Sequence, residues 1–113
     1  MKLDRNINPD KLGKYAVLKL RQLKALRDMG GGEIAEDIST ALTVLERAGI
    51  LDWGLANTKG EFMLIRLRDK YAEPSLQAYA DAAEADGEAE YAAEIREMAD
   101  RSGPHNRWCK KPD

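Results

Sequence analysis

Residues 32–67, GEIAEDISTALTVLERAGILDWGLANTKGEFMLIRL, decide the fold expected for this chain. Apolar residues recur at helical spacing over residues 33–48, and Gly49 follows as a helix stop. Residues 50–53 and 61–67 are short apolar runs, and the turn sequence NTKG lies between them, which predicts a β-hairpin. The run at 62–65 is apolar on both faces, so we expect a buried strand, or an edge that pairs in a homodimer.

A helix followed by a hairpin resembles the recognition helix and wing of a winged helix-turn-helix DNA-binding domain. That family places a separate short helix before the recognition helix, whereas residues 33–48 form one continuous helical pattern. The outward face of this helix carries Glu36, Thr40, Thr43, Glu46 and Arg47, and phosphate contacts need clustered Lys and Arg instead. We therefore interpret the segment as the structural centre of the protein and keep the winged-helix-like element as an alternative.

Three further helices are expected outside this stretch. Asn8-Pro9-Asp10 is a helix start signal, and the apolar spacing after it predicts a basic helix over residues 11–28. Residues 69–85 and 88–100 are rich in alanine and acids, and the intervening Asp86-Gly87 predicts an antiparallel helical hairpin. The predicted fold is a single compact α+β domain at residues 1–102, mostly helical, with about four helices and a small antiparallel β-hairpin. Residues 103–113 are predicted to be a C-terminal tail.

Composition favours a globular protein of the cytoplasm. Apolar residues make up 43% and charged residues 34% of the chain, and no apolar run approaches the roughly 20 residues that span a bilayer. The single cysteine, Cys109, fits a reducing compartment. We expect no membrane association.

Charge is unevenly distributed, and three groups of residues are candidate binding sites. Residues 1–29 carry a net charge of +5 and residues 70–102 carry −6. For each group the alternative interpretation is an ordinary solvated surface, and for Trp108 it is a side chain that folds back over an apolar edge. The candidates lie in the basic helix, at the acidic turn and in the tail: Lys14, Arg21, Lys24; Glu84, Asp86, Glu88; Arg107, Trp108, Lys110.

The sequence offers no recognisable catalytic or metal-binding set. His105 and Cys109 are two of the four N/S ligands that a structural zinc site normally takes, so metal would have to bridge two chains. We therefore expect no cofactor, no metal and no enzymatic activity. A carboxylate-based enzyme is the third hypothesis, and it predicts a concave pocket with paired acids.

Four segments together resemble small accessory proteins encoded by bacteriophages and prophages: MKLDRNINPDKLGKYAVLKLRQL, ERAGILDWG, EFMLIRLRDKYAEPSLQAYA and RSGPHNRWCKKPD. The resemblance implies a non-enzymatic protein of the host cytoplasm that binds a host or phage macromolecule, including an anti-defence role such as inhibition of CRISPR complexes. A protein is the expected partner. The alternative is a nucleic-acid-binding regulator that uses the basic helix 11–28 or the winged-helix-like element, and a homodimer is also open.

Overall fold

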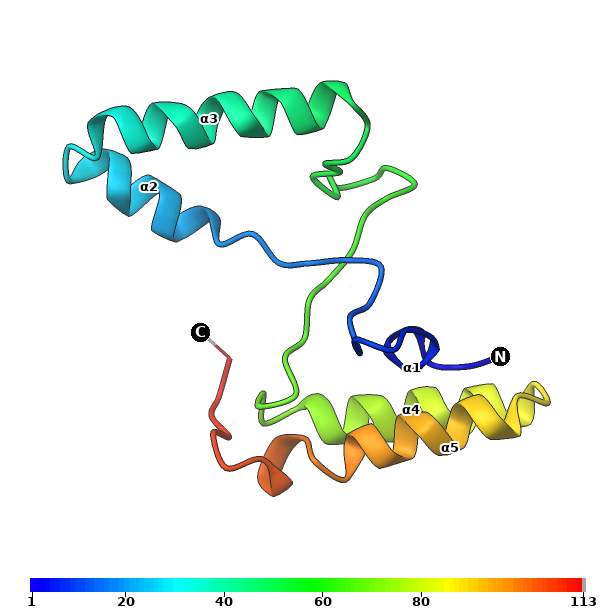
Figure 1. The fold of residues 1–113 in the computed structure, drawn as a ribbon. Helices are drawn as coiled ribbons and strands as arrows, with labels where there is room; N and C mark the ends of the chain where they lie inside the picture. The colour runs from blue at the N-terminus through cyan, green and yellow to red at the C-terminus, as the bar shows by residue number, and fades with distance from the viewer. Residues whose placement is uncertain (113) are drawn as a thin grey trace. The chain divides into compact units, whose positions relative to one another are not determined.

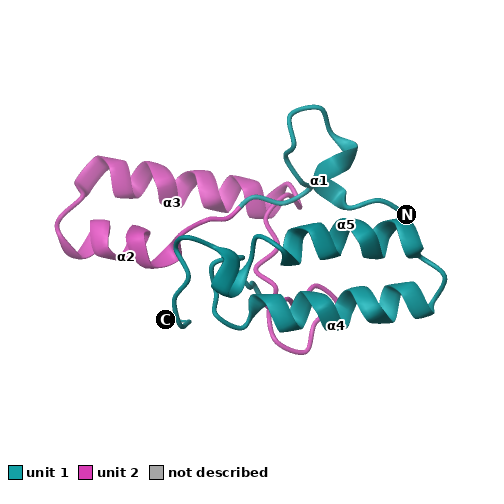
Figure 2. Cartoon of the chain, turned by 90° about the horizontal axis from the view of Figure 1, so that it is seen from below, with its two compact units in different colours: residues 1–16, 64–113 teal, residues 17–63 magenta. Residues whose placement is uncertain are grey.

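The computed structural model describes residues 1–112, and this part of the chain contains five α-helices and one short 3-10 helix (Figure 1). The described residues form two compact units (Figure 2). Unit 1 combines Met1–Ala16 with the chain from Leu64 onward, and unit 2 is Val17–Met63. The elements in chain order are α1 (Asp4–Ile7), α2 (Leu20–Asp28), α3 (Gly32–Arg47), α4 (Ala72–Ala85), α5 (Ala89–Ala99) and η1 (Gly103–His105).

Unit 2 is built from α2, α3 and the irregular chain that follows them. The turn between the helices begins at Met29 and Gly30, and Gly30 has a φ of 74°, which glycine adopts at little cost. Helix α3 has nearly the bounds that the apolar spacing predicts, so this prediction is confirmed. Only Leu23 of α2 and Ala35 of α3 are buried in unit 2, so its two helices enclose a very small core.

Unit 1 is centred on the hairpin of α4 and α5, which confirms the predicted antiparallel pair. The chain reverses at Gly87, whose φ is 90°. Ala80, Ala92 and Ile95 form its buried cluster, and Leu76, Ala83 and Tyr91 pack against them. Because alanine side chains are small, the two helices approach closely but bury little apolar area per residue.

The N-terminal residues add one apolar contact and several polar contacts to the α4–α5 hairpin. Leu3 packs against the buried cluster, and its backbone N–H donates to the Glu94 carboxylate. The Met1 ammonium pairs with Glu88 at 3.2 Å, and the Lys2 ammonium pairs with Glu90 at 3.1 Å. The hydrogen bond to Glu90 raises the pKa of Lys2. The acidic hairpin therefore holds the basic N-terminal residues through one apolar contact, one backbone hydrogen bond and two ion pairs.

The predicted helix over residues 11–28 is wrong in its first half, because α2 begins only at Leu20. Lys11 has a left-handed φ of 62°, which an α-helix does not tolerate. The Asp10 carboxylate accepts from the N–H of Leu12 at 2.9 Å, and the Asp4 carboxylate accepts from the N–H of Lys14 at 2.6 Å. These side chains offer the backbone partners that compete with helix formation.

The predicted α+β fold is also wrong, because the described residues contain helices and no strand pair at 50–53 and 61–67. The N–H groups of Ile50 and Leu51 both donate to the carbonyl of Leu45, so the first segment completes the end of α3. The carbonyl of Leu67 instead accepts from Gly103 at 2.7 Å. Without a hairpin the winged-helix-like element has no wing, and the proposed strand edge at 62–65 is not formed.

No helix among residues 1–112 combines the length and the apolar character needed to cross a membrane.

Candidate functional site

The C-terminal segment of unit 1 lies along the chain that leads into α4. Asp69 and Lys110 form an isolated parallel β-bridge. The N–H of Lys110 donates to the carbonyl of Arg68 at 3.0 Å, and the N–H of Lys70 donates to the carbonyl of Lys110 at 2.8 Å. Backbone hydrogen bonds from Gly103 and Lys110 therefore hold the C-terminal segment against residues 67–70.

Two buried residues fix the start of this segment. Ser102 is fully buried, and its hydroxyl donates to the carbonyl of Ala99 at 2.7 Å, which caps the end of α5. Gly103 has a φ of 54° and donates its N–H to Leu67. A Cβ atom at Gly103 would lie 3.3 Å from the carbonyl oxygen of Lys70. Residues 67–70 and the segment that begins at Gly103 therefore cross in close contact, and the crossing point is Gly103, which has no side chain.

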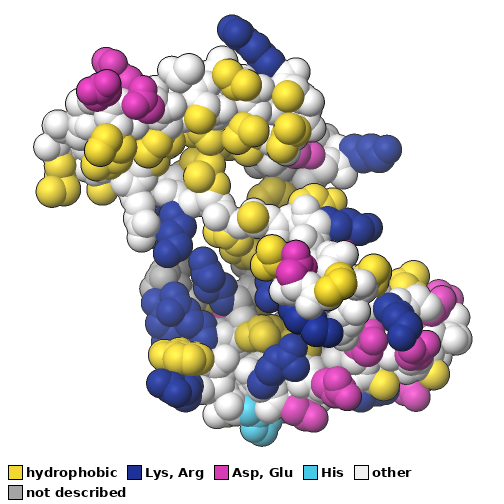
Figure 3. Space-filling view, viewed as in Figure 1, with side chains coloured by type: hydrophobic (Ala, Val, Ile, Leu, Met, Phe, Trp, Pro, Cys, Tyr) yellow, Lys and Arg dark blue, Asp and Glu magenta, His cyan; other side chains and the backbone are white. Residues whose placement is uncertain are grey.

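The bridge joins two basic sequences, RLRDK at 66–70 and RWCKK at 107–111. We call the resulting region the C-terminal basic surface. Its six cationic side chains and its tryptophan all belong to exposed residues, and Figure 3 shows Lys and Arg side chains gathered beside the C-terminal segment. The residues of the surface are Arg66, Arg68, Lys70, Arg107, Trp108, Lys110 and Lys111.

Trp108 is presented to solvent by a tight turn. Its N–H donates to the Asn106 side-chain oxygen at 2.9 Å, and the Asn106 amide nitrogen donates to the carbonyl of Arg101 at 3.1 Å. The Arg107 guanidinium lies 4.4 Å from the centroid of the indole ring, which is a cation–π contact. Because Trp108 remains 61% exposed, the tryptophan does not cover an apolar edge of unit 1.

Two acidic residues at this surface, Asp69 and Glu73, make local contacts. The Asp69 carboxylate accepts from the N–H of Tyr71 at 2.7 Å, at the approach to α4. The Glu73 carboxylate lies 3.1 Å from the Nε2 atom of His105. Both carboxylates keep their negative charge in these contacts, but the six cationic side chains of the surface outnumber them.

The predicted site residues fall into separate places. Arg107, Trp108 and Lys110 lie together on the C-terminal basic surface. Lys14 lies in the irregular N-terminal segment of unit 1, whereas Arg21 and Lys24 lie on α2 in unit 2. Because the basic helix begins only at Leu20, it carries Arg21 and Lys24 but not Lys14.

The acidic turn of the hairpin is partly neutralised by its own unit. Arg96 donates to Glu84 at 2.7 Å and to Asp81 at 2.9 Å, and these hydrogen bonds raise the pKa of Arg96. Glu88 is paired with the N-terminal ammonium. Asp86 is exposed at the end of α4. The turn is thus less negative than its sequence indicates.

Arg66, Arg68 and Lys70 belong to the surface but were absent from the predicted site. The usable signal was their density, because three of the five residues at 66–70 are Lys or Arg. The pairing of this stretch with residues 107–111 carried no comparable signal.

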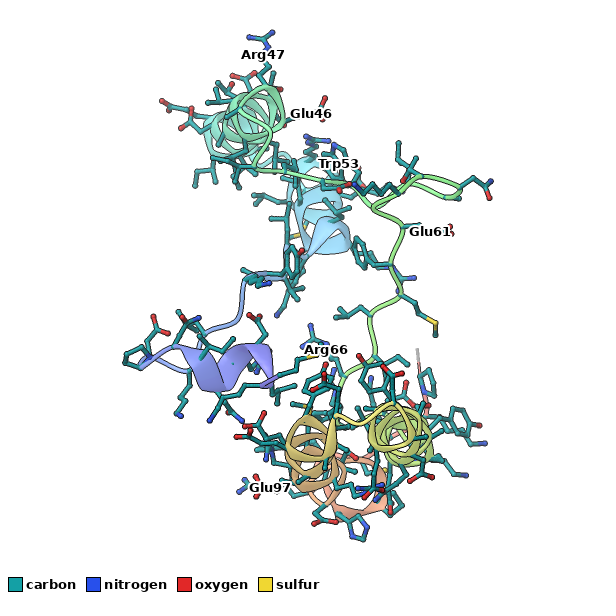
Figure 4. The ribbon with its side chains drawn as sticks, turned by 90° about the vertical axis from the view of Figure 1, so that its right-hand side faces the viewer. Glu46, Arg47, Trp53, Glu61, Arg66 and Glu97 are labelled. Carbon is teal, nitrogen blue, oxygen red and sulfur yellow. The ribbon has the colours of Figure 1, made fainter. Side chains whose placement is uncertain are left out.

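Unit 2 contains a second candidate, an open groove of about 310 Å³ between α2 and α3. Its lining is mainly apolar, and the Trp53 indole N–H donates to the Glu46 carboxylate at 2.6 Å at one side (Figure 4). The lining residues are Leu20, Leu23, Lys24, Arg27, Leu42, Thr43, Glu46 and Trp53. With one carboxylate, the groove lacks the paired acids that the carboxylate-enzyme hypothesis requires.

Within residues 1–112 no three His, Cys, Asp or Glu side chains are grouped closely enough to hold a metal ion. Cys109 is exposed on the C-terminal segment, and His105 faces Glu73.

Comparisons with protein-family models, curated proteins and solved structures gave no match, so the candidate function rests on the surfaces described above.

Proposed function

We propose that the protein acts without catalysis, as a binding protein that holds single-stranded nucleic acid on its C-terminal basic surface. The observation that carries the proposal is the β-bridge between Asp69 and Lys110, because it unites two basic sequences that lie about 40 residues apart. This mode of action is compatible with the phage accessory role that the sequence resemblance implies. The proposed nucleic-acid contact lies on the C-terminal segment, whereas the sequence alone pointed to the basic helix at residues 11–28.

The chemistry of the surface fits a nucleic acid better than an acidic protein. Phosphates of a single strand pair with Lys and Arg, and the exposed face of an indole accepts a stacked base. Arg107 and Trp108 already stack on each other, so a base added to the indole would lie beside a guanidinium. An acidic peptide would use the cations but would leave the exposed indole without an equivalent partner.

The sizes of the ionic and stacking contributions predict how binding should depend on salt and on Trp108. Single-strand binding weakens by about 0.7 in log K per unit of log salt for each phosphate neutralised, so six cations limit the slope to about −4. Stacking of one base on an aromatic ring contributes about 1–3 kcal/mol. Substitution Trp108→Ala should therefore weaken binding about 5- to 150-fold, with little change in the salt slope.

Fluorescence anisotropy with labelled single-stranded DNA and RNA tests the proposal across a salt series. The double variant Arg68→Glu/Lys111→Glu should lower the affinity and reduce the salt slope by about 1.4, because two phosphate contacts are lost. The matched control Lys14→Glu/Lys59→Glu makes the same change in net charge at two residues that do not belong to the surface, and it should bind nearly as the native protein does.

Three results would contradict the proposal. The first is an absence of binding to any oligonucleotide at low salt, and the second is equal weakening by the two double variants. The third is that polyglutamate displaces the oligonucleotide as effectively as unlabelled single strand, which would identify an acidic protein as the partner.

A further inference from the structure

The groove between α2 and α3 has a different chemistry at each end. Arg27 donates a hydrogen bond to the Ser39 hydroxyl, so its guanidinium marks the end of the groove nearest the turn between the helices. At the other end the Trp53 indole N–H donates to the Glu46 carboxylate at 2.6 Å (Figure 4). Glu46 lies seven residues beyond Ser39 on α3, which separates these two residues by about 10 Å along the helix axis.

The wall between the two ends is apolar and is partly exposed to water. Leu23 is buried, but Leu20 is 47% exposed and Trp53 is 38% exposed. The indole N–H is the polar group of the Trp53 ring, and because it already donates to Glu46, the rest of the ring offers an apolar surface. An alkyl tail that covers this wall would gain up to about 4-fold in affinity for each methylene that leaves water.

Two cations on α2 favour a ligand with an anionic head. Lys24 and Arg27 both line the groove, and they lie three residues apart, which places them on the same face of α2. Lys24 makes no ion pair among residues 1–112, and Arg27 uses one of its five N–H donors on Ser39. Because Glu46 is held at the far end by Trp53, an anionic head is favoured beside the two cations, with its tail toward the indole.

The volume of the groove fits a small amphiphile better than a protein helix. The groove holds about 310 Å³, and small-molecule sites range from about 300 to 1,000 Å³. Two turns of an α-helix, about 10 Å wide and about 10 Å long, occupy more than twice that volume. We propose that the groove binds a medium-chain carboxylate such as decanoate, with its carboxylate on Lys24 and Arg27 and its alkyl tail along the apolar wall toward Trp53.

The fluorescence of Trp53 in a Trp108→Phe variant of the full chain tests the proposal. Decanoate, added below its micelle concentration, should change the indole emission until the site is saturated. The affinity should rise by up to about 4-fold per methylene from hexanoate to decanoate. Decylamine has the same tail and the opposite charge, and it should bind about 10-fold more weakly because it cannot accept hydrogen bonds from the two cations.

A pair of matched variants locates the head group. Lys24→Glu should weaken decanoate binding by about 10-fold. Arg21→Glu makes the same charge change on α2 at a residue that does not line the groove, and it should bind as the native protein does. Arg68→Glu/Lys111→Glu should also keep the native affinity for decanoate, which separates this site from the C-terminal basic surface. Circular dichroism shows whether each variant keeps its helices.

The absence of a saturable response to decanoate at low salt would overturn the proposal. Equal affinities for decanoate and decylamine would overturn it too, as would equal weakening by Lys24→Glu and Arg21→Glu. A native protein that ignores decanoate and has a mass of twice 12.6 kDa by light scattering would show instead that a second copy closes the groove.

Discussion

Gly103 gives the sharpest test of the C-terminal basic surface, because a single methyl group there acts on both stability and binding. Its φ of 54° costs an L-residue about 1–2 kcal/mol. The added Cβ would also lie 3.3 Å from both the Lys70 carbonyl oxygen and the Glu73 Cβ, which is closer than most Cβ contacts. Overpacking adds about 1–3 kcal/mol. Gly103→Ala should therefore lower the free energy of unfolding by about 2–5 kcal/mol.

Gly87→Ala is the matched control for the backbone cost. Gly87 also has a positive φ, of 90°, but its Cβ would meet no atom within 4 Å. This variant should lose only about 1–2 kcal/mol. Denaturant unfolding is followed by the fluorescence of Trp108 in a Trp53→Phe background, which reports on unit 1 alone.

The carbonyl that the new methyl group presses on belongs to Lys70, whose N–H makes one of the two hydrogen bonds of the bridge. Folded Gly103→Ala protein should therefore bind oligonucleotide more weakly than folded Gly87→Ala protein. Equal unfolding midpoints for the two variants would refute the packing argument. Unchanged oligonucleotide affinity in Gly103→Ala would refute the link between the crossing and the surface.

Three further predictions concern the two units separately. Ile95→Ala removes the largest member of the buried cluster, 2% exposed, and should cost about 2–5 kcal/mol in denaturant unfolding. The hydrogen bond with Tyr79 raises the pKa of Tyr91 to about 12, so its contribution to stability is complete below about pH 10 and is lost as pH rises through 12. Tyr79→Phe should shift one tyrosinate absorbance transition toward pH 10, and an unmoved transition would contradict the assignment. In a variant whose only tryptophan is Trp53, Glu46→Ala should change the indole emission, because the 2.6 Å hydrogen bond is lost.

Local signals in the sequence predicted the helices well where nothing competed with them. Apolar residues at intervals of three and four predicted α3, and the alanine-rich helical patterns on either side of Gly87 predicted α4 and α5. Residues 11–19 show the same helical spacing, yet the carboxylates of Asp4 and Asp10 accept hydrogen bonds from the N–H groups of Lys14 and Leu12. Such a competition between a side chain and the helix depends on where the chain turns, which spacing alone does not encode.

The β-hairpin was predicted wrongly and Arg68 was missed from the site for the same reason, because both depend on which distant segment residues 66–70 pair with. Residues 66–70 do make β-type hydrogen bonds, but with residues 103–112 instead of 50–53. The sequence selected Arg107, Trp108 and Lys110 as candidate binding residues, and all three lie on the C-terminal basic surface. It did not reveal that Arg68 would lie beside them, because that neighbour is set by the path of the chain around a helical hairpin.

The bridge between Asp69 and Lys110 also constrains the order in which unit 1 folds. It closes a loop of about 40 residues, and such a closure costs entropy before any contact repays it. The α4–α5 hairpin is local in sequence and brings the two ends of that loop together, so it should form first. On the ribosome, a nascent chain would acquire the C-terminal basic surface only after residue 110 has emerged, because Lys110 supplies one side of the bridge.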